Sequence, residues 1–417
     1  MLQRIQTLKP RLNALFRPRG KIFYGWWIVA ACSGVQWLAA MTWMHSYGAY
    51  AVLMQEEFGW SMSVLSLAFA LTRLESGLLG PLQGWLVDKF GTRLILTVGT
   101  IIFSIGFFVF SQVNSITTYF VAFILIALGS SLGGFATLMV SLVNWFDRHR
   151  SMAVAWSQIG FSLGGLSVPL VILGLEAWGW RTMAIISGCM VLFIAGPLVQ
   201  MVKHRPEEIG EVPDGITISD AGIAQPHSSY QRQDSFTWRE AVRTPAFWLI
   251  SVGHGLSLLT VSSMLAHLIP HLTRSLNYTT LSAGIVFSAM TGAQLIGLFL
   301  GGYLGDRFAP KDPRWRIGWL AIGAVLSVPF TISAYLTSSL PLTIVGLTLG
   351  VVGSYMYAGA GHAVAQALVG PRMRAMTAAS MLFAMNLFGY GAGPVVAGWI
   401  SDAFGGDEAL RYSLAVM

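Results

Sequence analysis

The sequence predicts an all-α membrane protein made of two similar halves, and three observations carry this prediction. Only 10% of the 417 residues are charged and 54% are hydrophobic, with a mean hydropathy of +0.64, whereas soluble domains carry about 25% charged residues. Apolar runs recur along the whole chain, each close to the roughly 20 residues that a helix needs to cross a bilayer. One long polar segment, residues 203–244, separates these runs into two sets.

The apolar runs that are long enough to span a bilayer cover residues 24–52, 62–86, 94–112, 117–145, 151–174, 180–202, 245–272, 279–303, 316–336, 341–367 and 373–399. The first run is too long for a cleaved signal peptide, and no small-residue cleavage site follows it. A twelfth run begins at Arg411 and spans only about 10 Å of helix before the sequence stops. We therefore expect helix 12 to be truncated here and the natural chain to continue.

The basic residues predict the orientation of these spans. With a cytoplasmic N-terminus and alternating spans, all but four of the 25 Lys and Arg residues fall in cytoplasmic segments, and the exceptions are Arg73, Arg181, Arg274 and Arg411. Such a bias favours a multi-pass cell-membrane protein with its N-terminus inside, which we place in a bacterial inner membrane. The net charge of +7 follows from this topology, so no nucleic-acid partner is expected.

The domain organisation follows from the same pattern. We expect a cytoplasmic segment (1–23), a six-helix N-terminal bundle (24–202), a cytoplasmic linker (203–244) and a C-terminal bundle (245–417) with helices 7–11 and the start of helix 12. The second span of each half ends alike, as "GWLVDKF" and "GGYLGDRF", and the fifth spans share "GFSLGGLSVP" and "GYGAGP". Internal repeats of this kind are typical of transporters.

Charged residues are concentrated where the second span of each half reaches the cytoplasm. Asp88 and its counterpart Asp306 can each meet the positive N-terminal end of a neighbouring helix. Arg93 can pair with carboxylates or close the inner side, and Arg307 lies beside Asp306. Fixing the topology would explain the basic residues but not the repeated aspartate. We therefore expect gating roles for Asp88, Arg93, Asp306 and Arg307.

Several motifs resemble a known family. "GPLQGWLVDKFGTR" resembles the loop 2–3 signature of the major facilitator superfamily. "KIFYGWWIVAAC", "EEFGWSMSVLSLAFAL", "NWFDRHRSMAVAWSQIGFSLGG" and "HLIPHL" resemble its monocarboxylate-porter and oxalate/formate-exchanger branch, and residues 369–402 are similar to helix 11 of spinster-type transporters. The resemblance implies the major facilitator fold, two six-helix bundles with a pseudo-twofold repeat that work by alternating access. It also implies that Asp88 packs against the start of helix 11 in the outward-open state, and Asp306 against helix 5.

A substrate site in such a transporter lies near the midplane, where the halves meet. Counting along the spans at 1.5 Å per residue and adding the polar part of "TWMHSYGAY" gives the candidate substrate-binding residues Arg73, Gln36, His45, Tyr47, His254, Gln294, Tyr355 and Asn386. Glu75 and His254 are the candidates for proton coupling. For His254, a buried histidine bonded to a carbonyl is the alternative.

Among these candidates, Arg73 supports the most specific prediction. Relatives that move lactate or oxalate commonly carry an Arg in helix 8, and oxalate exchange also uses a Lys in helix 11. Here residues 281–304 hold no Arg or Lys, and helix 11 has none beyond Arg374. That departure argues against a dicarboxylate that needs two cations. An Arg at mid-membrane costs about 2.5–3.5 kcal/mol on insertion scales, so Arg73 serves either the substrate or the packing of the bundle.

The sequence therefore predicts a secondary active transporter of a small organic anion, a monocarboxylate, with proton coupling left open. Export of amphipathic compounds is the alternative, suggested by Met-rich and aromatic helices, and a membrane receptor or structural protein is the alternative of another class. We see no nucleophile–base pair, phosphate loop or metal spacing, so no enzyme, cofactor or metal is predicted. The i, i+4 pair His267 and His271 fits the outer interface better than a metal. The expected partners are a small anionic substrate, H⁺ and the lipid bilayer, and the expected state is a monomer.

Overall fold

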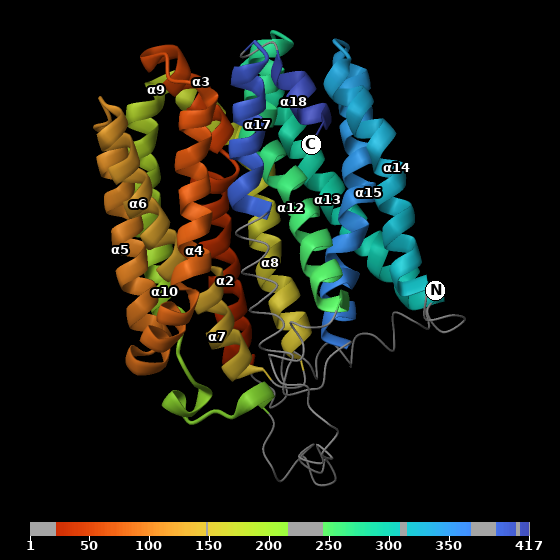
Figure 1. Cartoon of the computed structure of the whole chain (residues 1–417). Helices are drawn as coiled ribbons and strands as arrows, with labels where there is room; N and C mark the ends of the chain where they lie inside the picture. The colour runs from red at the N-terminus through yellow and green to blue at the C-terminus, as the bar shows by residue number, and fades with distance from the viewer. Residues whose placement is uncertain are drawn as a thin grey trace.

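The computed structural model describes residues 22–146, 149–215, 245–308, 315–367, 389–405 and 409–416, apart from the side chains of some helical residues. These ranges fold into helices joined by short connections, as an all-α membrane protein requires (Figure 1). Five helical segments among them are long and apolar enough to cross a bilayer. The all-α prediction is thereby confirmed.

The first half occupies the left of Figure 1 and follows the predicted spans closely. Its elements are α2 (Tyr24–Ala39), η1 (Ala40–Met44), α3 (Tyr47–Phe58), α4 (Met62–Phe90), α5 (Thr92–Ser111), α6 (Ile116–Leu132), α7 (Phe135–Trp145), α8 (Arg150–Leu166), α9 (Val168–Met190), η2 (Val191–Ala195) and α10 (Gly196–Met201). The run 117–145 divides into α6 and α7 at Gly133–Gly134. Inside α9, Gly179 has φ +76° and makes the turn between the fifth and sixth spans.

The second half occupies the right of Figure 1. Its elements are α12 (Pro245–Pro270), η5 (His271–Ser275), α13 (Thr280–Phe308), α14 (Trp315–Leu336), α15 (Leu340–Ala367), α17 (Ala392–Ala403) and α18 (Leu410–Val416). Most of the predicted run 373–399 lies outside the described residues. The short 3₁₀ turns η3 (Pro206–Ile209) and η4 (Pro213–Gly215) belong to the linker between the halves.

The two ends of the helix bundle can be named from the chain itself. We call the end with residues 203–215 and the turn at Gly91 the proximal end, at the bottom of Figure 1, and the opposite end the distal end. Gly91 has φ +80°, a conformation that glycine adopts without strain, and it allows α4 to reverse into α5.

The start of the linker is held on the first half. Ser141 Oγ and Trp145 Nε1 both donate to the carbonyl of Lys203, at 2.7 and 2.9 Å, and Asn144 Nδ2 donates to the carbonyl of His204 at 3.1 Å. Because α7 supplies all three donors, residues 203–204 follow the first half in any movement of the two halves.

Candidate functional site at the interface of the two halves

At the distal end, α3 of the first half packs closely on α12 of the second. A Cβ on Gly48 would lie 3.2 Å from the carbonyl oxygen of Ala266 and 3.3 Å from Ile269 Cβ, so the two helices approach more closely here than most side chains permit. One helical turn beyond, the Arg274 guanidinium lies 3.0 Å from the carboxylate of Glu56 and donates to the carbonyl of Val52 at 3.3 Å.

A second distal contact joins α4 with α12 and α17. His267 is 1% exposed, and its Nε2 lies 2.8 Å from the carbonyl oxygen of Pro394 and 3.1 Å from Ser66 Oγ. Gly398 packs against this contact, since an added Cβ would lie 3.0 Å from Ser66 Oγ. We call His267, Ser66 and Pro394 the distal latch, because they connect both halves at one buried point.

An aspartate on α17 bonds to the first turn of α4 at the exposed edge of this contact. Asp402, at the end of α17, accepts a hydrogen bond from the backbone N–H of Ser63 at 3.0 Å and another from its hydroxyl. Ser63 lies in the first turn of α4, where a negative charge is favoured by the helix dipole. The carboxylate therefore holds the distal ends of α4 and α17 together.

A third contact joins α8 with α13 beside the first span. Ser288 Oγ donates to the carbonyl of Gly165 at 3.2 Å, and a Cβ on Gly165 would clash with Thr291, at 2.6 Å, and with His45. The His45 ring packs edge-on against Phe161 of α8 and Phe287 of α13, with ring centroids 4.6 and 5.6 Å away. His45 thus lies where three helices from both halves meet.

The first span is interrupted at this point, which explains how His45 reaches the interface. The π-helical turn η1 ends at Met44, and α3 begins only at Tyr47. Ser46 Oγ donates to the carbonyl of Met41 at 2.6 Å, and the backbone N–H of His45 donates to Ala40 at 2.9 Å. Such π-turns recur at functional sites, because the extra residue turns one side chain out of the regular register.

Two other predicted substrate residues of the first span face the interior of the first half. Gln36 Nε2 donates to the carbonyl of Ser157 at 3.1 Å and ties α2 to α8. Tyr47 stacks on Phe69 and donates to the carbonyl of Leu65 at 2.7 Å. Both side chains are buried and used in packing, so the structure does not bring them to His45.

Gln294 and Tyr355 lie on neighbouring helices of the second half. Gln294 is buried and follows Thr291 by three residues, which places it one turn closer to the proximal end. Gly297 lies about one turn of α13 further toward the proximal end. A Cβ there would lie 3.0 Å from Tyr355 Cβ, so α13 packs on α15 at this level. Gln294 therefore lies at the level where α13 changes from contacts with α8 to contacts with α15.

Several predicted residues lie outside the described side chains, namely Arg73, His254, Asp306 and Asn386. The backbone at position 73 is helical and lies seven residues after Ser66, about two turns of α4 toward the proximal end. Glu75, on the same helix, is half-buried.

Of the remaining gating candidates, Arg93 and Arg307 form hydrogen bonds within their own halves. Asp88 is exposed at the end of α4. Arg93 Nε donates to the carbonyl of Gln200 at 3.1 Å, and Arg307 donates to the Tyr303 hydroxyl at 2.6 Å. The start of helix 11, which the resemblance makes the partner of Asp88, lies outside the described residues.

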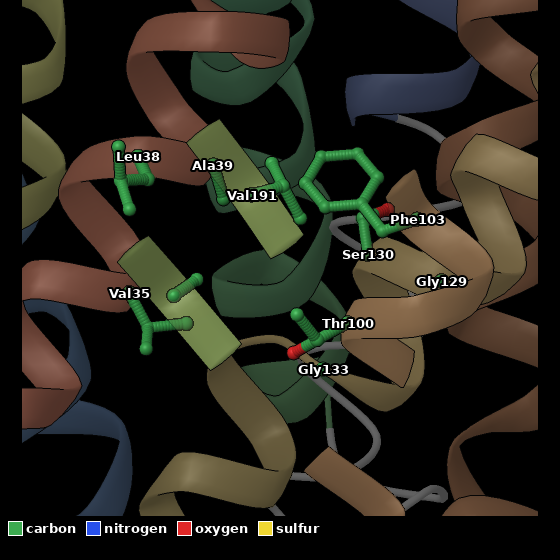
Figure 2. A pocket seen from close by; sticks show the side chains of 10 residues that line it. Val35, Leu38, Ala39, Thr100, Phe103, Gly129, Ser130, Gly133 and Val191 are labelled. Carbon is green, nitrogen blue, oxygen red and sulfur yellow. The ribbon is translucent and has the colours of Figure 1, made fainter. Parts of the chain in front are cut away.

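One small cavity lies inside the first half, bordered by α2, α5, α6 and η2 (Figure 2). Its volume is about 20 Å³, and Thr100 and Ser130 are its polar residues. Thr100 and Ser130 already donate to helix carbonyls. The cavity has room for about one water molecule and is separate from the interface of the halves.

Sequence reasoning missed the partners of the interface. Ser66, Thr291, Pro394 and Asp402 were not singled out, because serine, threonine and proline are common in spans and their pairing depends on helices far apart in the chain. The pair His267 and His271 was expected at the outer interface, and the buried contact of His267 with Ser66 across the two halves was not predicted. Among the residues described, no group of three His, Cys, Asp or Glu side chains could hold a metal ion.

Comparison with known proteins gives the family. A model of the Major Facilitator Superfamily matches residues 32–267 and 253–417, and the chain therefore belongs to this superfamily. It is an integral membrane protein of the secondary-transporter kind, and nothing in the family match indicates an enzyme. The family prediction made from the "GPLQGWLVDKFGTR" motif is confirmed.

Similar proteins differ in what their names say they carry. An MFS-type efflux pump of Mycolicibacterium smegmatis is 27% identical over 66% of this chain and 61% of the pump, so the match spans less than two thirds of that relative. The oxalate:formate antiporter of Oxalobacter formigenes is 27% identical over 75% of this chain and 66% of the antiporter. The probable sulfoacetate transporter SauU of Cupriavidus necator is 26% identical over 75% of this chain and 79% of its own.

A solved structure with the same fold is a bacterial homolog of the human lysosomal transporter Spinster, in an inward-facing and unoccupied conformation. It superposes with a TM-score of 0.77 over 95% of this chain and 94% of its own, at 21% identity. This likeness shows the fold.

Proposed function

We propose that this transporter carries a small organic anion, a monocarboxylate, by alternating access. The observation that carries the proposal is the similarity, across three quarters of the chain, to proteins named for oxalate, formate and sulfoacetate. All three compounds are small organic acids, and the choice of a monocarboxylate rests on Arg73 being the one Arg or Lys within the predicted spans, apart from those near their ends. The alternating-access part rests on the contacts at the distal end, which join the halves through α3, α4 and α8.

The proposed substrate site lies just proximal of the distal contacts. His45 and Thr291 form its distal boundary, and Gln294 lies one turn of α13 closer to the proximal end. Arg73 is proposed as the anion-binding cation, because it is the one Arg or Lys within the predicted spans, apart from those near their ends. A guanidinium can hold a carboxylate through two parallel hydrogen bonds, and Glu75 is proposed as the proton carrier.

The proximal end is proposed to be the cytoplasmic end. The distribution of basic residues supports this orientation, since the linker and the turn after α4 both lie there. Because the described distal contacts are closed, we propose that this conformation blocks exchange of the substrate with the outer side.

Export of amphipathic compounds is the second candidate. The identity with the mycobacterial efflux pump favours it, and so does the aromatic and methionine content of 12% aromatic residues and 18 Met. An exporter of this kind would not need a guanidinium at the substrate site.

The test is uptake of labelled formate, acetate, lactate, oxalate and sulfoacetate into proteoliposomes, with and without a pH gradient. We expect saturable uptake of at least one monocarboxylate, and competition by other acids but not by the matching amides. Absence of uptake for every acid, together with transport of amphipathic dyes by the same preparation, would replace the first proposal by the second.

A further inference from the structure

The distal latch has a hydrogen-bond arrangement that fixes which ring nitrogen of His267 carries hydrogen. The carbonyl of Pro394 can only accept, and it lies 2.8 Å from Nε2, so Nε2 must be the N–H donor. Ser66 Oγ donates its own hydrogen to the carbonyl of Met62 at 2.6 Å. Its oxygen is therefore free to accept from the same Nε2–H at 3.1 Å.

The other nitrogen of this ring is left without a role in the closed state. Among the described residues, Nδ1 of His267 has no hydrogen-bond partner, and it is buried. In the neutral Nε2–H tautomer, Nδ1 carries only a lone pair, whose burial costs less than that of a charged group. A protonated ring would place a second N–H and a positive charge at a site that offers Nδ1 no acceptor, which is costly away from water.

The closed packing also excludes water from the latch. Ser66 is 1% exposed, and Met62 beside it is 2% exposed. Gly398 lies against both, since its added Cβ would be 3.1 Å from the Met62 carbonyl oxygen. His267 itself is 1% exposed, so water reaches its ring only when the packing around the latch opens.

We propose that His267 is a proton-binding site of the distal gate, which binds H⁺ when the distal end opens and must release it before that end closes. This inference rests on the alternating-access part of the proposed function and not on the identity of the substrate. Proton uptake at Nδ1 then favours the distally open state, and a lower pH at the distal side opens the gate.

Other charged and titratable groups around the latch act on the same equilibrium. They are Asp402 on α17, Glu56 on α3, Glu75 on α4, His271 and Arg274 on η5, and Arg411 on α18, with Arg73 on α4 outside the described side chains. Glu56 and Arg274 pair with each other, and Asp402 bonds Ser63. His267 is the member that bonds across the halves through a ring nitrogen, so its protonation acts on the contact itself.

The test measures the distal distance between spin labels in the full chain, in nanodiscs and without substrate. Cys32 and Cys189 are replaced by alanine, and the labels are placed on the exposed distal residues Asn114 and Ser338 of opposite halves. Between about pH 8 and pH 5.5, the range in which imidazoles titrate, we expect the ratio of open to closed molecules to rise roughly tenfold. A single proton site can change it at most about tenfold per pH unit.

His267→Gln is the first variant, because its amide N–H can still donate to Pro394 but cannot take up a proton. We expect its open-to-closed ratio to stay within about twofold over the same pH range. Ser66→Ala is the matched control, which loses the acceptor but keeps the imidazole, and it should open more at pH 8 and still respond to pH. Equal pH responses in wild type and His267→Gln, or none in wild type, would overturn the proposal.

A second measurement does not depend on the variants. Nitrogen NMR of ¹⁵N-histidine-labelled protein at pH 8, with His267→Gln used for assignment, should show a neutral ring protonated at Nε2. A charged ring or the Nδ1–H tautomer in closed molecules would overturn the proposal. Because no substrate is present, failure of this test leaves the organic-anion proposal standing, and failure of the uptake test leaves this one standing.

Discussion

The distal and proximal ends of the interface between the two halves are held in different ways. At the distal end, polar groups bond across the halves, as Ser66 does with His267 and Ser63 with Asp402. At the proximal end, Arg93 bonds to Gln200 of its own half and Arg307 to Tyr303 of its own helix. Separating the proximal ends would break neither of these two bonds, whereas separating the distal ends would break both of the cross-half pairs.

The largest expected effect falls between the two ends, at the proposed anion site. Arg73→Gln should lower anion uptake roughly 10- to 100-fold, because hydrogen bonds to a charged group contribute about 1.5–3 kcal/mol. Arg73→Lys should lower it less, since an ammonium keeps the charge but lacks the planar fork. Substrate affinity and melting temperature are measured on the same purified variants.

Arg181→Gln is the matched control for Arg73, because this guanidinium pairs with Glu57 at 2.6 Å within the first half. It should leave substrate affinity unchanged. An Arg73→Gln protein that melts at a lower temperature but binds substrate normally would remove Arg73 from the site and leave it a packing role.

A smaller effect is expected from crowding the distal contact. Gly165→Ala places a methyl group against Thr291 and His45, and overpacking of this kind costs about 1–3 kcal/mol. The distally closed population should therefore fall about fivefold or more, as measured by spin-label distances between the halves. Gly292→Ala on α13 is the control, because an added Cβ there meets no atom within 4 Å. Equal effects of the two alanines would show that the contact of α8 with α13 does not determine closure.

At the proximal end we expect a several-fold effect from Asp88→Asn. The change removes a charge proposed to meet a helix N-terminus when that end closes, an interaction of about 0.3–2 kcal/mol. Accessibility of single cysteines at each end should shift toward the proximally open state. Glu207→Gln, an exposed acid of the linker, controls for charge alone. If neither accessibility nor transport changes, Asp88 serves only the topology.

The smallest effect is expected from Glu56→Gln. The carboxylate of Glu56 is half exposed and the Arg274 guanidinium partly so, and exposed ion pairs contribute about 0–1 kcal/mol. The distally closed fraction should change less than about fivefold and lose part of its dependence on salt. A larger change would mean that the ion pair, rather than the buried latch, dominates the distal contact.

The sequence predicted the fold well because span length and hydropathy are local properties. The prediction of a single run at 62–86 corresponds to α4, and that of 279–303 to α13. It could not predict the π-turn before His45 or the break at Gly133–Gly134, because both depend on neighbouring helices. The fifth and sixth spans were separated correctly, at 151–174 and 180–202, and the structure turns between them at Gly179.

The candidate site was only partly predictable, for the same physical reason. Helix-centre counting found Gln294, and the polar part of "TWMHSYGAY" added His45; both lie near the contact of α8 with α13. The same two steps also selected Gln36 and Tyr47, since position along a span gives depth in the membrane but not the direction of a side chain. The distal latch joins residues more than 120 positions apart, and no local pattern in a single sequence encodes such a pairing.

The most direct test of alternating access uses a disulfide across the distal end. Ser63→Cys and Asp402→Cys, in a protein with Cys32 and Cys189 replaced by alanine, put two thiols where the hydroxyl and carboxylate now meet. Oxidation should stop uptake of the organic anion into proteoliposomes, and a reductant should restore it, while each single cysteine protein remains active under the same treatment. Full uptake by completely cross-linked protein would contradict the account, because the distal ends would then not need to separate during transport.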